Sequence, residues 1–344
     1  MKEKGQLTAM YADAIKKNWP LPAFTDYQGQ SYTYSQVAEK IAMLHQFFKE
    51  AKISSGDHIA LLGNNSAEWS TSFIGIMTYG AVVVPILPDF SVENVHHIVN
   101  HSDAKLLICT RAQFERLAPD HMKKAEGIID VNDFEVLHDK GDKLGKALRK
   151  TRSWYLDLQL KPEDVKFETG NQSDLCVISY TSGTSGFTKG VMLPQRSLWS
   201  NIRFAQENMP LKSGDRIVSF LPLAHVFGLL FEFLFPFTLG CHINFLTKIP
   251  SPAIVTRAFG EIRPQLILSV PLVIEKIYKK RILPKIDKPV MKALLKTPLL
   301  SGMIENKVNK ALTETFGERF HEIVIGGAPL SEDVEAFFRK IGFR

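Results

Sequence analysis

The chain has 344 residues, of which 45% are hydrophobic and 23% charged, an ordinary balance for a folded protein that argues against disorder or a fibrous repeat. Its 42 Lys and Arg against 36 Asp and Glu give a net charge of +6, which suits anionic ligands but does not indicate nucleic-acid binding. Cys109, Cys176 and Cys241 lack the spacing of a disulfide framework or a zinc site, so we expect a reducing cytoplasm.

Two segments bear on whether the chain is exported or inserted into a membrane. Residues 1–30 have no apolar stretch behind their lysines and do not resemble a signal peptide. The most apolar window, residues 226–246, has near-membrane length, but Glu232 and Pro236 interrupt it. We therefore predict a buried core segment there and not a membrane span.

Helical and strand patterns alternate through residues 33–109. Residues 33–52 place an apolar stripe on one face of a helix, with Ser35 as its expected N-cap. This alternation predicts a mostly parallel sheet covered by helices on both faces, an α/β fold. The further expected elements are strands 58–62, 81–86 and 104–109 and helices 69–79 and 91–101, with Gly80 closing the first of these two helices.

The second half of the chain begins with a polar stretch. Residues 111–170 show weak periodicity, and we predict a surface excursion with little chemistry. From Asp174 the pattern sharpens again. The expected elements are strands 175–180 and 190–193 and a helix over residues 197–208.

A glycine-rich segment, residues 180–190, reads Tyr-Thr-Ser-Gly-Thr-Ser-Gly-Phe-Thr-Lys-Gly. Glycines let backbone N–H groups turn toward an anion, and the hydroxyls and Lys189 add donors and a positive charge. The segment therefore predicts a phosphate-binding loop. Its register does not fit a Walker loop, which disfavours a kinase, while a plain Ser/Gly turn is the bland alternative.

Two apolar segments follow the loop. Residues 221–228 place His225 among apolar neighbours, where a histidine is often merely a core residue. Phenylalanines at 227, 231, 233, 235 and 237 crowd the next stretch, and they fit an alkyl-chain tunnel and ordinary core packing equally well. Neither reading was preferred.

The last third contains two strand ends and a basic stretch. Val270 precedes a helix with Pro271 in its first turn, and a strand over 322–325 runs into Gly326 and Gly327, where bare backbone lets a flat ring lie close. Residues 276–310 form a basic amphipathic stretch. It predicts either a solvated helical face or a peripheral membrane contact.

Residues 180–190 resemble the signature of the adenylate-forming superfamily, which comprises acyl-CoA synthetases, luciferases and peptide-synthetase adenylation domains. Ser185 stands where the family has threonine, and Thr188 where it has proline. Residues 221–228 resemble the family segment that places a histidine and an aromatic residue near the acid-binding pocket, and residues 322–330 resemble the family's adenine-binding segment. Residues 270–280 resemble the long-chain acyl-CoA synthetase version of a strand end followed by a helix.

This resemblance implies the large N-terminal α/β domain of such enzymes, with helices packed on two mostly parallel sheets and an end before the last subdomain and the C-terminal lid. We expect a first part over residues 1–172 and a second over 173–344, with sheets shared between them. The implied activity is ATP-dependent conversion of a fatty acid to acyl-AMP and then acyl-CoA, with a homodimer as a possible assembly. A fragment lacking the lid is expected to be inactive alone.

The resemblance also implies roles for individual residues. Lys189 and His225 would be catalytic, and Thr181 would contact Mg²⁺. His225, Phe227, Gly228 and Val270 would contact the acid, with coenzyme A as co-substrate. The nucleotide would bind Thr181, Ser182, Gly183, Thr184, Ser185, Gly186, Thr188, Lys189, Gly190, Gly326, Gly327, Ala328 and Pro329.

Two alternatives share these residues. One is an acyl-AMP ligase that loads a carrier protein in place of coenzyme A. The other is a non-catalytic protein that binds a nucleotide or an acyl ligand. Acyl chain length is not specified by any of the segments above.

Overall fold

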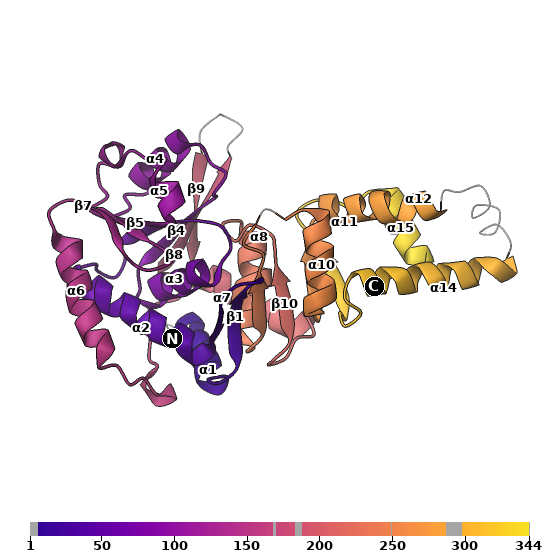
Figure 1. The fold of residues 1–344 in the computed structure, drawn as a ribbon, viewed down its shortest axis with the longest axis horizontal. Helices are drawn as coiled ribbons and strands as arrows, with labels where there is room; N and C mark the ends of the chain where they lie inside the picture. The colour runs from indigo at the N-terminus through magenta and orange to yellow at the C-terminus, as the bar shows by residue number, and fades with distance from the viewer. Residues whose placement is uncertain (1–5, 168–169, 183–187, 249, 287–297, 344) are drawn as a thin grey trace.

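The computed structural model describes residues 6–167, 170–182, 188–248, 250–286 and 298–343. Figure 1 shows an elongated molecule whose broad body holds the large sheet, while an arm of helices extends away from it. The arm contains α10 (Pro252–Ile262), α11 (Pro271–Ile277), α12 (Leu283–Ile286), α14 (Pro298–Thr315) and α15 (Glu332–Lys340).

The largest sheet has seven strands in the order β7-β6-β5-β3-β4-β8-β9. Its inner strands run parallel, and the edge strands β7 and β9 are antiparallel to their neighbours. The expected mostly parallel sheet is confirmed. The strands are β3 (His58–Leu62), β4 (Val82–Ile86), β5 (Leu106–Cys109), β6 (Gly127–Asp130), β7 (Val136–Asp139), β8 (Leu175–Ser182) and β9 (Thr188–Pro194).

Two smaller sheets complete the described strands. One has the order β10-β11-β1-β2 and is parallel except between β1 and β2, and the other pairs β12 with β13 in parallel. The two-stranded sheet is additional to the two sheets expected. Its strands and the others are β1 (Pro22–Asp26), β2 (Ser31–Thr33), β10 (Arg216–Ser219), β11 (His242–Phe245), β12 (Leu266–Ser269) and β13 (Glu322–Ile325).

Both larger sheets combine strands from distant parts of the chain. β8 lies beside β4 in the large sheet and pairs with β9 on its other side, and β1 and β2 join β10 and β11. The strand pairing does not separate residues 1–172 from residues 173–344, so the division of the chain into these two parts stays a prediction.

Helices cover the large sheet. α3 is buried along its whole length, as expected of a helix enclosed between sheet and neighbouring helices. The helices and helical turns of the body are α1 (Gln6–Lys17), α2 (Tyr34–Glu50), α3 (Ala67–Thr78), α4 (Val92–His101), α5 (Arg111–Phe114), η1 (Pro119–His121), α6 (Lys143–Leu156), η2 (Pro162–Asp164) and α7 (Gln195–Asn208).

The N-cap expected for α2 was wrong by two residues. Thr33 caps the helix: its side chain accepts from the N–H of Gln36, and the Gln36 side chain accepts from the N–H of Thr33. This reciprocal arrangement requires a Gln or Glu three residues after the cap, which Thr33 has and Ser35 lacks.

The interpretation of residues 111–170 as a surface excursion was also wrong. β6 is fully buried and pairs with β5, and β7 extends the sheet to its edge. The strand is only four residues long, with Ile128 and Ile129 between polar segments, so it shows too little periodicity to be recognised in the sequence.

The apolar window at residues 226–246 is core, as predicted. It forms α8 (Val226–Gly228), the π-helix η3 (Leu229–Leu234), α9 (Phe235–Thr238) and β11. Phe233, Phe235 and Phe237 are fully buried, and two of them lie against Phe24. Core packing therefore accounts for these three rings. Within the described ranges, no helix is long and apolar enough to cross a bilayer.

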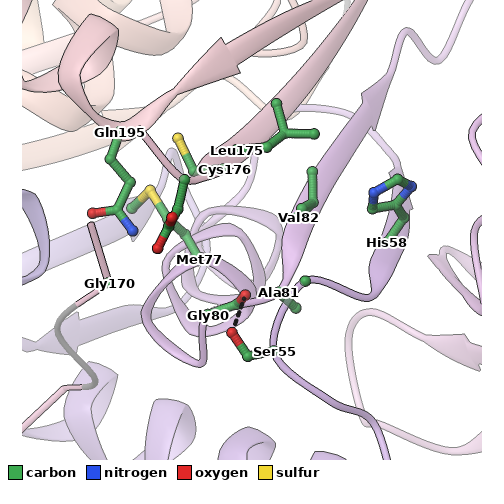
Figure 2. Close-up of a pocket in the computed structure, with 12 residues that line it drawn as sticks. Ser55, His58, Met77, Gly80, Ala81, Val82, Gly170, Leu175, Cys176 and Gln195 are labelled. Carbon is green, nitrogen blue, oxygen red and sulfur yellow. Dashed lines mark hydrogen bonds between the residues drawn. The ribbon is translucent and has the colours of Figure 1, made fainter. Parts of the chain in front are cut away.

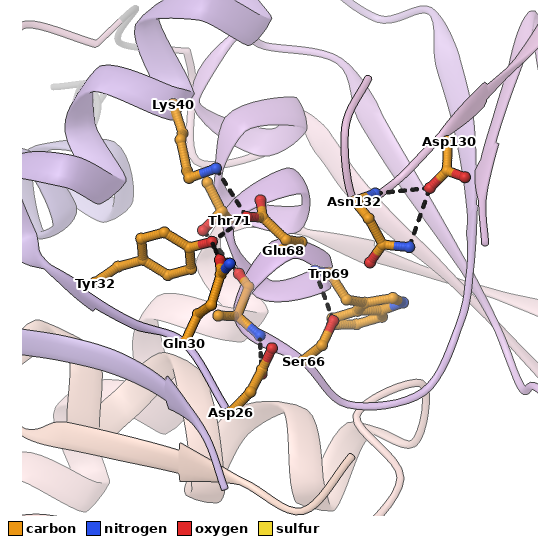
Figure 3. Close-up of polar contacts among 11 residues, drawn as sticks. Asp26, Gln30, Tyr32, Lys40, Ser66, Glu68, Trp69, Thr71, Asp130 and Asn132 are labelled. Carbon is orange, nitrogen blue, oxygen red and sulfur yellow. Dashed lines mark hydrogen bonds and ion pairs between the residues drawn. The ribbon is translucent and has the colours of Figure 1, made fainter. Parts of the chain in front are cut away.

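A polar cluster ties the β1–β2 hairpin to α3. Figure 3 shows Glu68 receiving the ammonium of Lys40 and the hydroxyl of Tyr32, both 2.8 Å from its Oε1 atom. Asp26 accepts the N–H of Ala67 at 2.8 Å, where the unpaired N–H groups of the helix begin. The four-stranded sheet is thus fixed to a helix that packs on the seven-stranded sheet.

The basic stretch at residues 276–310 is only partly described. It contains the end of α11, the π-helical turn η4 (Tyr278–Ile282), α12 and the start of α14, while residues 287–297 lie outside the described ranges. Met303 is 70% exposed on α14. A membrane contact through this stretch stays a prediction.

Candidate functional site

The glycine-rich segment forms the end of a β-hairpin, which we call the phosphate hairpin (β8 and β9). Thr181 pairs with Lys189, and Tyr180 pairs with Gly190. Both Thr181 and Lys189 are exposed. Ser182 is the last residue of β8, and the predicted binding residues Gly183, Thr184, Ser185 and Gly186 lie outside the described residues.

The base of the phosphate hairpin is closely packed. A Cβ atom on Gly190 would lie 2.9 Å from Cγ2 of Ile178 and 3.2 Å from Cζ of Tyr180, so only glycine leaves room for the tyrosine ring. The Tyr180 hydroxyl lies 2.8 Å from Nδ1 of His101 on α4. Burial raises the pKa of Tyr180, which keeps the phenol protonated.

One hydroxyl at the mouth of the hairpin lacks a partner. The Oγ1 atom of Thr188 is buried and forms no hydrogen bond within the portion of the chain that the structure describes. A buried hydroxyl without a partner is costly, so such an atom marks a place where a polar ligand fits.

A second group of predicted residues gathers at the carboxyl ends of β12 and β13. The register pairs Ser269 with Ile325, and the N–H of Gly326 donates to the carbonyl of Ser269 at 3.0 Å. Val270 and Gly326 therefore follow side by side. In parallel sheets this edge is where ligands generally bind.

Phe227 joins this group from α8. A Cβ atom on Gly326 would lie 2.6 Å from both Cε2 and Cζ of Phe227, so the ring lies directly on the glycine backbone. Gly327 has φ +85°, a left-handed conformation that favours glycine, and Cγ1 of Val270 lies 3.7 Å from its Cβ position. Ala328 and Pro329 follow and are exposed. We call residues 326–329 the glycine turn.

His225 lies two residues before Phe227, as the N-cap of α8. Its N–H donates to the carbonyl of Pro222 at 3.0 Å, and its side chain is exposed. Desolvation by the surrounding protein lowers the pKa of His225, so the imidazole is neutral at pH 7. Gly228 is buried, and its Cβ position is 2.9 Å from the carbonyl of Pro222.

The structure thus brings His225, Phe227, Gly228, Val270 and the glycine turn into one region. The phosphate hairpin pairs within the large sheet, and it also contacts α4 and α7. In the chain, the phosphate hairpin and His225 are separated by α7, β10 and the loop after it.

Two polar residues of this region were not predicted. Asn65 follows β3 and Glu232 lies in η3, and both hydrogen-bond the loop that leads to His225. In the sequence, Glu232 stands out only as an interruption of an apolar window. A single carboxylate in the most apolar part of a chain could itself have indicated a buried group with backbone partners.

A small cavity of about 90 Å³ lies beside this loop. It is lined from the carboxyl ends of β3, β4, β10 and β11, and its lining includes Asn64, Asp89 and Lys248. Strand ends of the two larger sheets therefore meet on the His225 side of the molecule.

A larger cavity of about 570 Å³ lies at the opposite edge of the large sheet. Figure 2 shows its lining, which includes His58, Ala81, Val82 and Leu175 at or beside the amino ends of β3, β4 and β8. None of the binding or catalytic residues predicted from the sequence lines this cavity. We therefore do not take it as the candidate site.

Metal ligands are sparse here. Among the residues that the structure describes, no group of three or more His, Cys, Asp or Glu is placed to hold a metal ion. Thr181 offers one exposed hydroxyl. This set alone does not fit Mg²⁺, which prefers carboxylate and phosphate oxygens.

The chain resembles curated fatty-acid ligases in sequence. Long-chain-fatty-acid–CoA ligase 5 of Mus musculus is 26% identical over 338 residues, covering 89% of this chain and 48% of that protein. Long chain acyl-CoA synthetase 5 of Arabidopsis thaliana is 24% identical over 339 residues, covering 90% and 49%. The chain spans about half the length of these relatives.

Solved structures share the fold. The N-terminal domain of FACL13 from Mycobacterium tuberculosis superposes with a TM-score of 0.70 at 21% identity, covering 97% of this chain and 73% of that one. A luciferase from Phrixothrix hirtus gives a TM-score of 0.76 at 17% identity, covering 99% and 60%. The family model described as AMP-binding enzyme matches residues 12–344, so the chain belongs to the AMP-binding enzyme family.

Proposed function

We propose that the protein activates fatty acids, forming acyl-AMP from ATP and then acyl-CoA. The observation that carries the proposal is the convergence of Phe227, Val270 and the glycine turn at the carboxyl ends of β12 and β13. An exposed glycine backbone beside an aromatic ring suits a flat adenine, and the neighbouring His225 suits a carboxylate. The similarity to long-chain-fatty-acid–CoA ligases supports a long acyl chain.

In this proposal the nucleotide spans both groups of residues. The adenine lies on Gly326, Gly327, Ala328 and Pro329, and the triphosphate lies at the phosphate hairpin. Lys189 is exposed and free to turn toward the phosphates, and the Oγ1 atom of Thr188, which has no partner among the described residues, supports a phosphate oxygen as its partner.

His225 faces the acid. As a neutral imidazole it donates a hydrogen bond to the carboxylate without neutralising its charge, so the carboxylate keeps its nucleophilicity. A carboxylate oxygen attacks the α-phosphorus, the bond to the bridging oxygen of the β-phosphate breaks, and pyrophosphate leaves. Lys189 stabilises the charge that develops on the phosphates. Phe227, Gly228 and Val270 shape the apolar side of the acid pocket.

The thiolate of coenzyme A then attacks the acyl carbonyl, and AMP leaves. Mg²⁺ would accompany ATP as its counterion, and the exposed hydroxyl of Thr181, within the glycine-rich segment, would be a contact for it. Because the described residues do not form a magnesium site, no step of the mechanism is assigned to the ion.

Nucleotide binding tests the proposal on this chain. ATP affinity measured by calorimetry should fall about tenfold or more in Lys189→Ala, since a charged hydrogen bond is worth ~1.5–3 kcal/mol. Lys146→Ala is the matched control, because Lys146 is 68% exposed on the distant helix α6. Equal ATP affinity in wild type and Lys189→Ala would contradict the assigned role.

Turnover tests the activity of the whole protein. Pyrophosphate release should depend on the added acid and rise along a series of fatty acids of increasing chain length, with AMP as the other product. Formation of ADP would indicate phosphoryl transfer and refute the proposal. Thioester formation with a carrier protein but not with coenzyme A would favour an acyl-AMP ligase, and ligand binding without turnover would favour a non-catalytic protein.

A further inference from the structure

The loop that leads to His225 is held by side chains from two different parts of the fold. Residues 219–223, which we call the 219–223 loop, begin at the last residue of β10, Ser219. The N–H groups of Phe220 and Leu221 both donate to Oε2 of Glu232, each at 2.9 Å. Asn65 approaches the same loop from the end of β3. Its Nδ2 donates to the carbonyl of Leu221 at 2.7 Å, and its Oδ1 accepts the N–H of Leu223 at 3.0 Å.

These bonds leave the loop little freedom. Phe220, Leu221 and Leu223 are each at most 6% exposed, so apolar packing holds the side chains while Glu232 and Asn65 hold the backbone. The next turn is fixed as well, since the N–H of His225 donates to Pro222 and Gly228 packs on the Pro222 carbonyl. The backbone between β10 and α8 is therefore held at Phe220, Leu221, Leu223 and His225.

Burying the carboxyl group of Glu232 costs free energy that a purely structural contact would not require. It is fully buried, and its Oε1 atom has no hydrogen-bond partner among the residues covered by the structure. Burial raises the pKa of Glu232 well above its usual range, while the N–H bonds from Leu221 and Phe220 and the side chain of Ser219 act to lower it. It also lies in the π-helix η3, and such irregular helical turns are frequent at functional sites. An apolar residue at this position would fit the surrounding core better.

We propose that Glu232 and Asn65 are positioning residues, which together fix the 219–223 loop and so orient His225 and Phe227 toward the glycine turn. The phenylalanine is in contact with Gly326, where a shift of about 1 Å would change the shape of the pocket. Asn65 follows β3 of the seven-stranded sheet and Glu232 lies in the segment between β10 and β11, so the loop also couples the two larger sheets.

The test compares variants that keep or remove the bonds to the loop. Glu232→Gln retains an acceptor for both N–H groups, whereas Glu232→Leu removes it. Asn65→Ala removes the second set of bonds from a half-buried position and serves where the leucine variant does not fold. Asn244→Leu is the matched control: Asn244 is 6% exposed, and its side chain donates to the carbonyls of Ile217 in β10 and His242 in β11.

Two readouts are used, and only the second rests on the proposed function. The first is the NMR signal and pH titration of the His225 imidazole. We expect both to move in Glu232→Leu and Asn65→Ala, and to stay near those of the wild type in Glu232→Gln and Asn244→Leu. The second is affinity for a hydrolysis-resistant palmitoyl-adenylate analogue, which should fall about tenfold or more in the first two variants.

The outcomes separate the two ideas. If folded Glu232→Leu and Asn65→Ala leave the His225 signals unchanged, or if Asn244→Leu moves them equally, the positioning role is refuted. If the His225 signals move as expected while the wild type does not bind the palmitoyl-adenylate analogue, the positioning role stands and the proposed substrate is wrong.

Discussion

Gly326→Ala offers a sharp test of the contact on which the candidate site depends. The added methyl carbon would lie 2.6 Å from two ring carbons of Phe227, whereas nonbonded carbons prefer about 3.5–4.0 Å. The ring must therefore move by about 1 Å. The φ angle of Gly326 is outside the left-handed region, so the backbone accepts alanine and the cost is steric.

The expected loss of stability follows from this overlap. Overpacking by one methyl group in a tight contact costs ~1–3 kcal/mol, and the lower end applies here because Phe227 is half-buried and can turn outward. The displaced ring would occupy part of the proposed adenine surface. The binding free energy for the palmitoyl-adenylate analogue should therefore be weakened by more than the free energy of unfolding is reduced.

A double-mutant cycle with Phe227→Ala isolates the contact. Urea unfolding of the wild type, both single variants and the double variant should give a coupling of ~1 kcal/mol or more, because Gly326→Ala has nothing to displace once the ring is gone. Strictly additive free energies would refute the contact. Gly327→Ala is the control: its φ of +85° costs ~1–2 kcal/mol of backbone strain, with or without the Phe227 ring.

Three further predictions concern other parts of the chain. Burial lowers the pKa of His45 to about 4 in the folded protein. Between pH 6.5 and pH 4 the unfolded state therefore binds a proton at His45 that the folded state does not, and the free energy of unfolding decreases as the pH is lowered through this range. From pH 7 to pH 5 this contributes ~2 kcal/mol, and urea unfolding of His45→Gln should lose that much less over the same range. Thr33→Ala removes the N-cap of α2 and should lower the free energy of unfolding by ~1 kcal/mol, with Ser35→Ala much less affected. If the basic stretch contacts membranes, reversing Lys307 and Lys310 on α14 should reduce co-sedimentation with anionic vesicles, and unchanged sedimentation would remove the idea.

Local patterns in the sequence predicted most elements of the body. The run of apolar residues at 58–62 is the strand β3 with the same bounds, and residues 92–101 form the expected helix after the cap Ser91. These segments carry their own signals, namely continuous burial and a capping residue. β6 was missed because a four-residue strand has no such signal of its own. Its pairing with β5 is what makes it a strand.

The assembly of the site depends on contacts that no single segment specifies. The glycines at 326 and 327 indicated a bare backbone, and the aromatic residue at 227 indicated an apolar pocket, but nothing in either segment places one on the other. That contact follows from the pairing of β12 with β13 and from the position of α8, both of which are properties of the whole fold.

The two sides of the region differ in how they are built, and the difference bears on function. The glycine turn offers little besides backbone, so its shape depends on what lies against it. The His225 side is held by Glu232, Asn65 and close packing at Gly228, which together leave no alternative path for the chain. A rigid His225 segment opposite the glycine turn suits a site that must align two reactants, because the positions of its side chains are then fixed before either ligand binds. The cost of burying Glu232 is understandable in these terms: it supplies two backbone bonds at the one point where an apolar side chain would leave the loop free to shift.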